Sequence, residues 1–203
     1  FAADAIDRLH STAEAHKRIM VVEVMGRYAG WIALQAGMAG GADVILMPEI
    51  PYDLEKVAAA IRKRESFGAK FSIVVVAEGA TPIGGSVTLR QEARAGYVER
   101  LGGVGVLIAD RLEDMTGREA RCVVLGHLQR GGGPTAFDRV LATRFGGAAV
   151  ELIQRGVFGK MVANNPPDIV PIPLSDVVGR TKTVPLDSDL LRTARAIGVS
   201  FGD

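Results

Sequence analysis

The sequence has little of several features that would direct it to a special class of protein. Among 203 residues there is one cysteine, Cys122, so no disulfide can form within the chain, which fits a reducing compartment. The 24 basic and 23 acidic residues leave a net charge of +1, which gives no overall field to attract nucleic acid or an anionic membrane. Apolar runs such as residues 73–77 fall far below the roughly 20 residues of a membrane-spanning helix. We therefore expect a cytoplasmic protein without a nucleic-acid or membrane partner, in which any anion site is local.

What the chain does contain fits a folded α/β protein. Hydrophobic residues make up 48% of it, with 25 glycines and 9 prolines, and a chain of this size can bury about 70% of its unfolded surface. The first residue is Phe1, and residues 1–10 have the pattern of an amphipathic helix rather than of a secretion signal. We expect that the chain begins inside a longer protein.

Helical and strand patterns alternate along most of the chain. Apolar residues at helical spacing predict helices over residues 1–16, 31–39, 90–101, 105–114 and 137–155. A further helix is predicted to open at residues 51–53 and to end at about residue 64. Apolar, β-branched runs predict strands over residues 18–24, 43–47, 71–77 and 121–125. These strands are apolar throughout, which indicates a parallel sheet with helices on both faces. The predicted fold is an α/β three-layer sandwich of the Rossmann-like type.

The proline content changes near residue 160. Residues 1–160 are predicted to form one ligand-binding lobe. The following segment, 161–203, carries Pro166, Pro167, Pro171, Pro173 and Pro185. It is predicted to be an extended wrap of the same domain unit, with one short helix near residues 187–196.

Three strands end in polar or glycine-rich runs, at residues 25–27, 78–79 and 126–133. Ligands of parallel sheets bind beyond the carboxyl ends of the strands, so these runs are expected to converge. Arg27 and Arg130 offer planar forks of donors that suit phosphate oxygens. Glu78 can accept from sugar hydroxyls, and His127 can donate to a phosphate or a hydroxyl. Together these residues suit a phosphorylated sugar.

Each run taken alone also has a purely structural interpretation. Gly26 and Gly30 fit an ordinary turn, Glu78 fits an ion pair at a sheet edge, and His127 fits a structural histidine. The glycines at 131–133 fit a flexible loop before a helix, and they do not form a Walker loop, which would need Gly-Lys-Ser/Thr. The convergence of three independent strand ends favours the anion pocket.

Four short segments of the sequence resemble those of a known family. The segments Val-Val-Glu-Val-Met-Gly-Arg at 21–27, Ala-Gly-Gly-Ala at 39–42, Ala-Glu-Gly at 77–79 and Val-Leu-Gly-His-Leu-Gln-Arg-Gly-Gly at 124–132 resemble the phosphofructokinase family. The resemblance runs over residues 1–160 in the expected order. The Pro-rich tail is similar to that of the branch with pyrophosphate-dependent and mixed-donor members.

The resemblance implies a fructose 6-phosphate site and a shared subunit interface. Its substrate-binding positions are Met25, Gly26, Arg27, Glu78, His127 and Arg130, and Arg27 is also implied to neutralise charge during catalysis. Arg18 and Arg121 match arginines that reach the 6-phosphate bound by a neighbouring subunit. The resemblance therefore implies a homo-oligomer, either a dimer or a tetramer.

The implied reaction is transfer of a phosphoryl group to the 1-hydroxyl of fructose 6-phosphate in glycolysis, with ATP or pyrophosphate as donor and Mg²⁺ as cofactor. The donor-binding Gly-Gly-Asp motif and the Thr-Ile-Asp-Asn-Asp loop, whose first aspartate is the general base, do not occur in this sequence. Phosphoryl transfer depends on positioning and charge neutralisation, so the chain is expected to be inactive alone, with the Mg²⁺ ligands in the missing half.

The sequence also bears on allosteric regulation and on two alternative functions. His10, Phe67 and Ala69 stand where regulated bacterial enzymes carry basic effector-binding residues, although Asp43 keeps an acidic one, so we expect no ADP or phosphoenolpyruvate control. One alternative is a non-catalytic, sugar-phosphate-sensing or regulatory module. A plain nucleotide-binding Rossmann domain is disfavoured, because residues 25–30 offer two of the three glycines of Gly-x-Gly-x-x-Gly.

Overall fold

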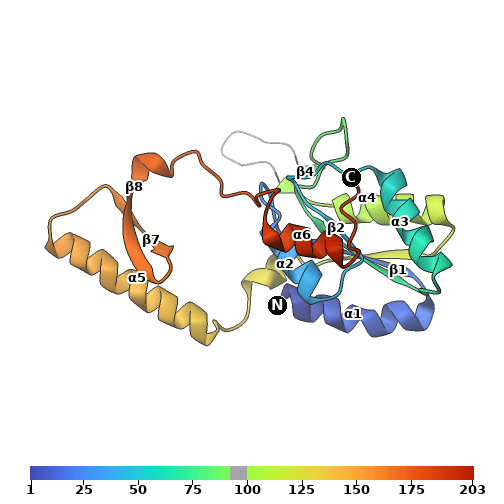
Figure 1. Cartoon of the computed structure of the whole chain (residues 1–203), viewed down its shortest axis with the longest axis horizontal. Helices are drawn as coiled ribbons and strands as arrows, with labels where there is room; N and C mark the ends of the chain where they lie inside the picture. Colours follow the sequence, from blue (N-terminus) through green and yellow to red (C-terminus); the bar gives the residue numbers. More distant parts are fainter. Residues whose placement is uncertain (92–99) are drawn as a thin grey trace. The chain divides into compact units, whose positions relative to one another are not determined.

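The computed structural model describes residues 1–91 and 100–203 (Figure 1). The chain forms two compact units: Phe1–Arg130 together with Thr183–Asp203, and Gly131–Lys182. The expected division into residues 1–160 and 161–203 does not coincide with these units, and as a statement about domains it stays a prediction.

A parallel sheet lies at the centre of the first unit. Its strands are β1 (Ile19–Val24), β2 (Val44–Leu46), β3 (Ser72–Ala77) and β6 (Ala120–Val124), in the spatial order β2-β3-β1-β6. All of their pairings are parallel, which confirms the predicted sheet. The register aligns the last residues of β1 and β3 with each other, and the ends of β1 and β6 lie at the same edge. The loops that follow these three strands therefore start side by side.

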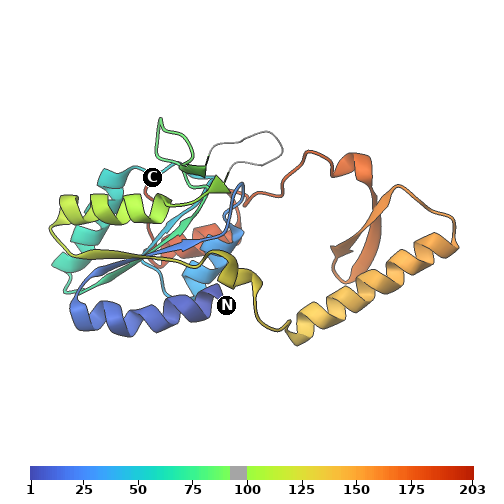
Figure 2. The ribbon, with the colours of Figure 1, turned by 180° about the vertical axis from the view of Figure 1, so that it is seen from behind.

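Helices cover both faces of this sheet. One face packs against α1 (Ala2–His16), α2 (Trp31–Ala39) and α6 (Asp189–Ala196), and the other packs against α3 (Leu54–Ser66) and α4 (Val104–Thr116). Figures 1 and 2 show α1 and α4 on opposite sides of the strands. The predicted helices at 1–16, 31–39, 51–64 and 105–114 are thus confirmed to within a few residues.

The central strands are apolar throughout because they are buried on both faces. In β1, Met20 and Val22 pack into the core beneath α1 and α2, while Ile19 and Val21 pack into the core beneath α3 and α4. This alternation follows from the period of two in a strand, and helices on both sides make every position a core position. Glu23 is the exception in β1, and its partners belong to the functional site.

The predicted helix at residues 90–101 lies mostly outside the described residues. Its ends are described, and they form two short antiparallel strands, β4 (Leu89–Gln91) and β5 (Arg100–Leu101). The prediction is therefore wrong at both ends, since pairing across the two segments replaced the local helical pattern.

The end of the chain returns to the first unit. Ser200 pairs with Val44 as a parallel bridge, with hydrogen bonds from the Ile45 amide to the Ser200 carbonyl (2.9 Å) and from the Ser200 amide to the Asp43 carbonyl (3.0 Å). Phe201 is fully buried in the core. The short helix predicted near residues 187–196 is confirmed as α6, and this tail extends the sheet at β2.

The second unit consists of α5 (Ala136–Gln154), a hairpin of β7 (Lys160–Asn165) with β8 (Asp168–Pro173), and the 3₁₀ turn η2 (Leu174–Asp176). A capping box between Thr135 and Asp138 begins α5, which confirms the helix predicted at 137–155. The hairpin was not predicted, because its prolines indicated a loop. Although α5 has 19 residues, neither it nor any other helix among the described residues combines the length and apolarity needed to cross a membrane.

Candidate functional site

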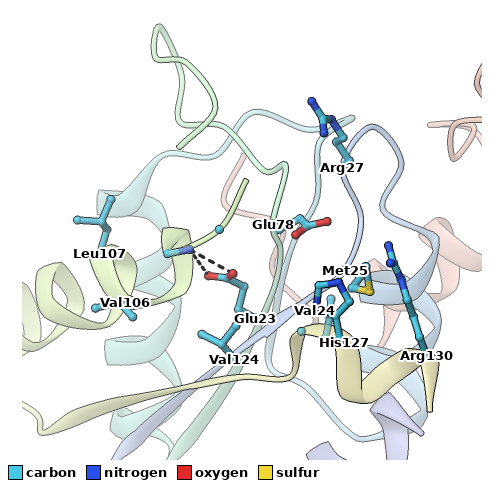
Figure 3. Close-up of a pocket in the computed structure, with 13 residues that line it drawn as sticks. Glu23, Val24, Met25, Arg27, Glu78, Val106, Leu107, Val124, His127 and Arg130 are labelled. Atoms are coloured by element: carbon cyan, nitrogen blue, oxygen red, sulfur yellow. Dashed lines mark hydrogen bonds between the residues drawn. The ribbon is translucent and has the colours of Figure 1, made fainter. Parts of the chain in front are cut away.

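A pocket of about 860 Å³ lies in the first unit at the carboxyl ends of β1, β3 and β6 (Figure 3). It is the convergence point that the strand ends predict. Its lining residues are Glu23, Val24, Met25, Arg27, Glu78, Gly102, Gly103, Val106, Leu107, Val124, Gly126, His127 and Arg130.

The loop after β1 is held by contacts with the loops after β3 and β6. The Gly26 amide donates to Glu78 Oε1 (3.4 Å), and the Met25 amide donates to Gln129 Oε1 (3.4 Å). The Glu78 amide in turn donates to the Val24 carbonyl (2.9 Å). These side-chain contacts span 104 and 52 residues of sequence, so three distant segments fix one another at the mouth of the pocket.

Gly79 permits the closest of these approaches. A Cβ at this position would lie 2.0 Å from the Arg27 carbonyl oxygen and 2.8 Å from that of Gly26, while the Gly79 amide donates to the Gly26 oxygen at 3.1 Å. Only a residue without a side chain lets the two backbones meet in this way. The sequence singles out this strand-end glycine, but its partner is visible only in three dimensions.

Three cationic or ionisable donors line the pocket from two segments. His127 and Arg130 belong to the 3₁₀ turn η1 (Gly126–Arg130), where residues three apart lie on the same side of the turn. Arg27 comes from the loop after β1, and its Nε donates to the Tyr28 hydroxyl (2.7 Å). Its guanidinium lies 5.1 Å from the centre of the Tyr28 ring. Figure 3 shows Arg27 and Arg130 on the side of the pocket away from α4.

Glu23 lies in the floor of the pocket and was not singled out from the sequence. Its side chain is only 2% exposed, and it accepts from the Gly103 amide (3.2 and 3.0 Å to its two oxygens) and from the Gly105 amide (2.8 Å). A carboxylate without hydrogen bonds would be strongly unfavourable at this depth, and these amides satisfy it. The sequence signal is a single charged residue inside an otherwise apolar strand.

The wall formed by α4 is apolar. Val106 and Leu107 line it with exposures of 46% and 54%, and Val124 of β6 adjoins it. The pocket thus has a basic side, formed by Arg27, His127 and Arg130. The opposite side is apolar and is formed by Val106, Leu107 and Val124.

Arg18 and Arg121 lie away from this pocket. They are at the amino ends of β1 and β6, and both bind Glu119, at 3.1 Å from Arg18 and 2.6 Å from Arg121. These two arginines therefore lie at the amino ends of the strands, whereas the pocket lies at the carboxyl ends. The other six predicted positions lie together at or beside the pocket: Met25, Gly26, Arg27, Glu78, His127 and Arg130.

The pocket does not fit a metal ion. Its two carboxylates, of Glu23 and Glu78, accept from backbone amides. Among residues 1–91 and 100–203, no group of three or more His, Cys, Asp or Glu side chains is arranged to hold one.

Asp43, which the family resemblance links to an effector site, forms contacts within the chain. It accepts from the Ile73 amide (2.9 Å) and forms an ion pair with Arg64 (2.8 Å), while His10 lies against the Gly40 carbonyl (2.6 Å). Burial raises the pKa of Asp43, although the Ile73 amide and Arg64 act in the opposite direction. The expected lack of effector control stays a prediction.

Comparison with known proteins gives consistent matches. The family described as Phosphofructokinase matches residues 1–153. The chain is 54% identical over 202 residues to an ATP-dependent 6-phosphofructokinase of Chloroflexus aurantiacus, with 100% of this chain and 55% of the relative covered. It is 53% identical to a pyrophosphate–fructose 6-phosphate 1-phosphotransferase of Streptomyces coelicolor, with 99% of this chain and 57% of the relative covered.

Solved structures agree in fold. Phosphofructokinase from Saccharomyces cerevisiae superposes with a TM-score of 0.72 at 31% identity, covering 86% of this chain and 22% of that one. A pyrophosphate-dependent phosphofructokinase from Nitrosospira multiformis gives a TM-score of 0.77 at 25% identity, covering 100% of this chain and 54% of that one. The chain spans about half the length of the curated relatives that it matches. It belongs to the phosphofructokinase family.

Proposed function

We propose that this chain is the fructose 6-phosphate-binding part of a 6-phosphofructokinase. The complete protein would transfer a phosphoryl group to the 1-hydroxyl of fructose 6-phosphate. The donor would be ATP or pyrophosphate, since relatives of both kinds match the chain at 54% and 53% identity.

One observation carries this proposal. A single pocket is lined by Arg27, His127 and Arg130 on one side and contains Glu78 near its centre. Arginine forks and a histidine suit a phosphate, and a carboxylate suits sugar hydroxyls, so the chemistry of a sugar phosphate is matched within one cavity.

The family resemblance implies the role of each residue, and this arrangement supports it. Arg130 and His127 bind the sugar or its phosphate, and Glu78 accepts from its hydroxyls. Met25 and Gly26 hold the sugar through the loop after β1. Arg27, on the same loop, neutralises charge that develops on the transferred group.

Arg18 and Arg121 are proposed to serve the pocket of a neighbouring subunit. Both lie at the amino edge of the sheet, so they do not reach the pocket of their own chain. The protein is accordingly proposed to be a homo-oligomer, a dimer or a tetramer, whose site is completed across the interface.

The isolated chain is proposed to bind the acceptor without turning it over. Mg²⁺ is typical of kinases of this family and would assist the phosphoryl donor, and we place its ligands in the part of the relatives that this chain does not span. An assay for fructose 1,6-bisphosphate with ATP and with pyrophosphate should find no product from this chain. Clear turnover with either donor would refute that part of the proposal.

Acceptor binding is tested by calorimetric titration of fructose 6-phosphate into the chain and into Arg130→Ala. Loss of a charged hydrogen bond of about 1.5–3 kcal/mol should weaken binding by roughly ten- to a hundred-fold. The matched control is Arg8→Ala, which removes an exposed arginine from α1, outside the pocket. Equal affinity of Arg130→Ala and the unsubstituted chain would remove Arg130 from the site.

A further inference from the structure

The amino terminus of α4 opens into the same pocket as the basic residues. Gly102 and Gly103, which precede and cap this helix, line the pocket beside Glu23. Helix amino termini attract anions because their first amides lack partners within the helix and because the helix dipole is positive there. The pocket therefore contains two regions that could attract a phosphate: the basic side and the start of α4.

Glu23 occupies the second region. Its carboxylate accepts from the amides of Gly103 and Gly105, and it is almost fully buried. The dashed contacts in Figure 3 show it pointing from β1 toward the first turn of α4. A carboxylate of the protein itself thus occupies two amides at the start of this helix, those of the cap Gly103 and of Gly105 in the first turn.

We propose that Glu23 is a positioning residue that fixes the orientation of the sugar phosphate. By closing the start of α4 to anions, it leaves the basic side of the pocket, with His127 and Arg130, as the place where the phosphate of the sugar binds. This determines which end of the sugar faces Glu78. The inference rests on the proposed function for the identity of the ligand, but not for the closure itself.

A simple structural role for Glu23 would predict loss of stability alone. The orienting role predicts a change in where an anion binds. The NMR signals of four backbone amides distinguish these two roles. The amides of Gly103 and Gly105 report on anion binding at the start of α4, and those of Gly26 and Gly126 report on binding at the basic side.

The first experiment uses the unsubstituted chain and two-dimensional NMR. Inorganic phosphate and fructose 6-phosphate should each shift the amide signals of Gly26 and Gly126 and leave those of Gly103 and Gly105 in place. If phosphate shifts Gly103 and Gly105 directly in this protein, the proposed closure is wrong. This measurement needs no variant, so it holds even if a substitution prevents folding.

The second experiment uses Glu23→Gln, which removes the charge and keeps nearly the same shape. Inorganic phosphate should then bind about five-fold more tightly, the scale of a charge at a helix terminus. Fructose 6-phosphate should begin to shift the amides of Gly103 and Gly105. Unchanged phosphate affinity in a folded Glu23→Gln protein would overturn the inference.

Glu49→Gln is the matched control. Glu49 accepts from the amide of Gly30, the cap of α2 (3.0 Å), and from that of Val184 (2.8 Å), so it makes the same kind of contact outside the pocket. This control substitution should change stability without changing the response of the Gly103 amide signal to phosphate.

If the unsubstituted chain binds inorganic phosphate but shows no response to fructose 6-phosphate, the proposed function fails. The phosphate data would still test whether Glu23 closes the start of α4 to anions.

Discussion

Gly79→Ala is the substitution whose effect the structure defines most directly. The new Cβ would lie 2.0 Å from the Arg27 carbonyl oxygen and 2.7 Å from its carbonyl carbon. Both atoms are backbone, so no side-chain rotation relieves the overlap. The loops after β1 and β3 must separate by at least 1.0 Å to reach a separation of even 3.0 Å.

The expected loss of stability has two parts. Overpacking of this kind costs about 1–3 kcal/mol. Separation of the loops also breaks the hydrogen bond from the Gly79 amide to the Gly26 carbonyl (3.1 Å), worth about 1 kcal/mol. The total of roughly 2–4 kcal/mol lies below the stability of 5–15 kcal/mol typical of a domain, so the protein should still fold.

The larger consequence concerns ligand binding. Displacing the carbonyl of Arg27 moves its guanidinium out of the pocket geometry, and loss of one charged contact should weaken fructose 6-phosphate binding by about ten-fold or more. Thermal unfolding followed by circular dichroism and calorimetric titration measure the two effects separately.

The control for Gly79→Ala is Gly147→Ala in α5. A Cβ at Gly147 meets nothing within 4 Å, so the substitution should stabilise the helix by up to about 1 kcal/mol and leave binding unchanged. If Gly79→Ala binds fructose 6-phosphate as tightly as the unsubstituted chain, the reasoning that Gly79 fixes the Arg27 loop is refuted.

Two further predictions concern titration. The hydrogen bond from Arg195 lowers the pKa of Asp203, so the ionised carboxylate adds stability above its unfolded pKa, and this is lost as the pH falls through the folded pKa. Asp203→Asn should therefore lower the melting temperature at pH 7 by an amount equivalent to at most about 1 kcal/mol, because the pair is partly exposed. A difference in melting temperature that persists at pH 2 would show that it does not come from the ionised carboxylate. Burial, followed by the charges of Glu23 and Asp110, raises the pKa of Cys122 to about 12. At pH 8 a thiol reagent should modify the native chain much more slowly than the urea-unfolded chain, and equal rates would show that the thiol is not protected.

Much of the fold follows from local sequence patterns. The period of two in a strand and 3.6 in a helix, together with strands apolar on both faces, predict a parallel sheet between helices, and β1, β3 and β6 lie where those patterns place them. Because parallel strands end at the same edge, the convergence of Arg27, Glu78 and His127 also follows from their positions after three strands. The family follows from short motifs at those same strand ends.

Contacts between distant segments were decided only by the tertiary structure. Glu23 and Gly103 are 80 residues apart, and no local pattern indicates that the carboxylate of a strand caps that helix. The 2.0 Å distance that makes a glycine necessary at position 79 depends on the packing of two loops. The pairing of Ser200 with Val44 depends on the return of the chain to the first unit from Thr183 onward. Sequence period fixes which way a side chain points within its own element, whereas the partner it meets depends on how elements far apart in the chain pack against each other.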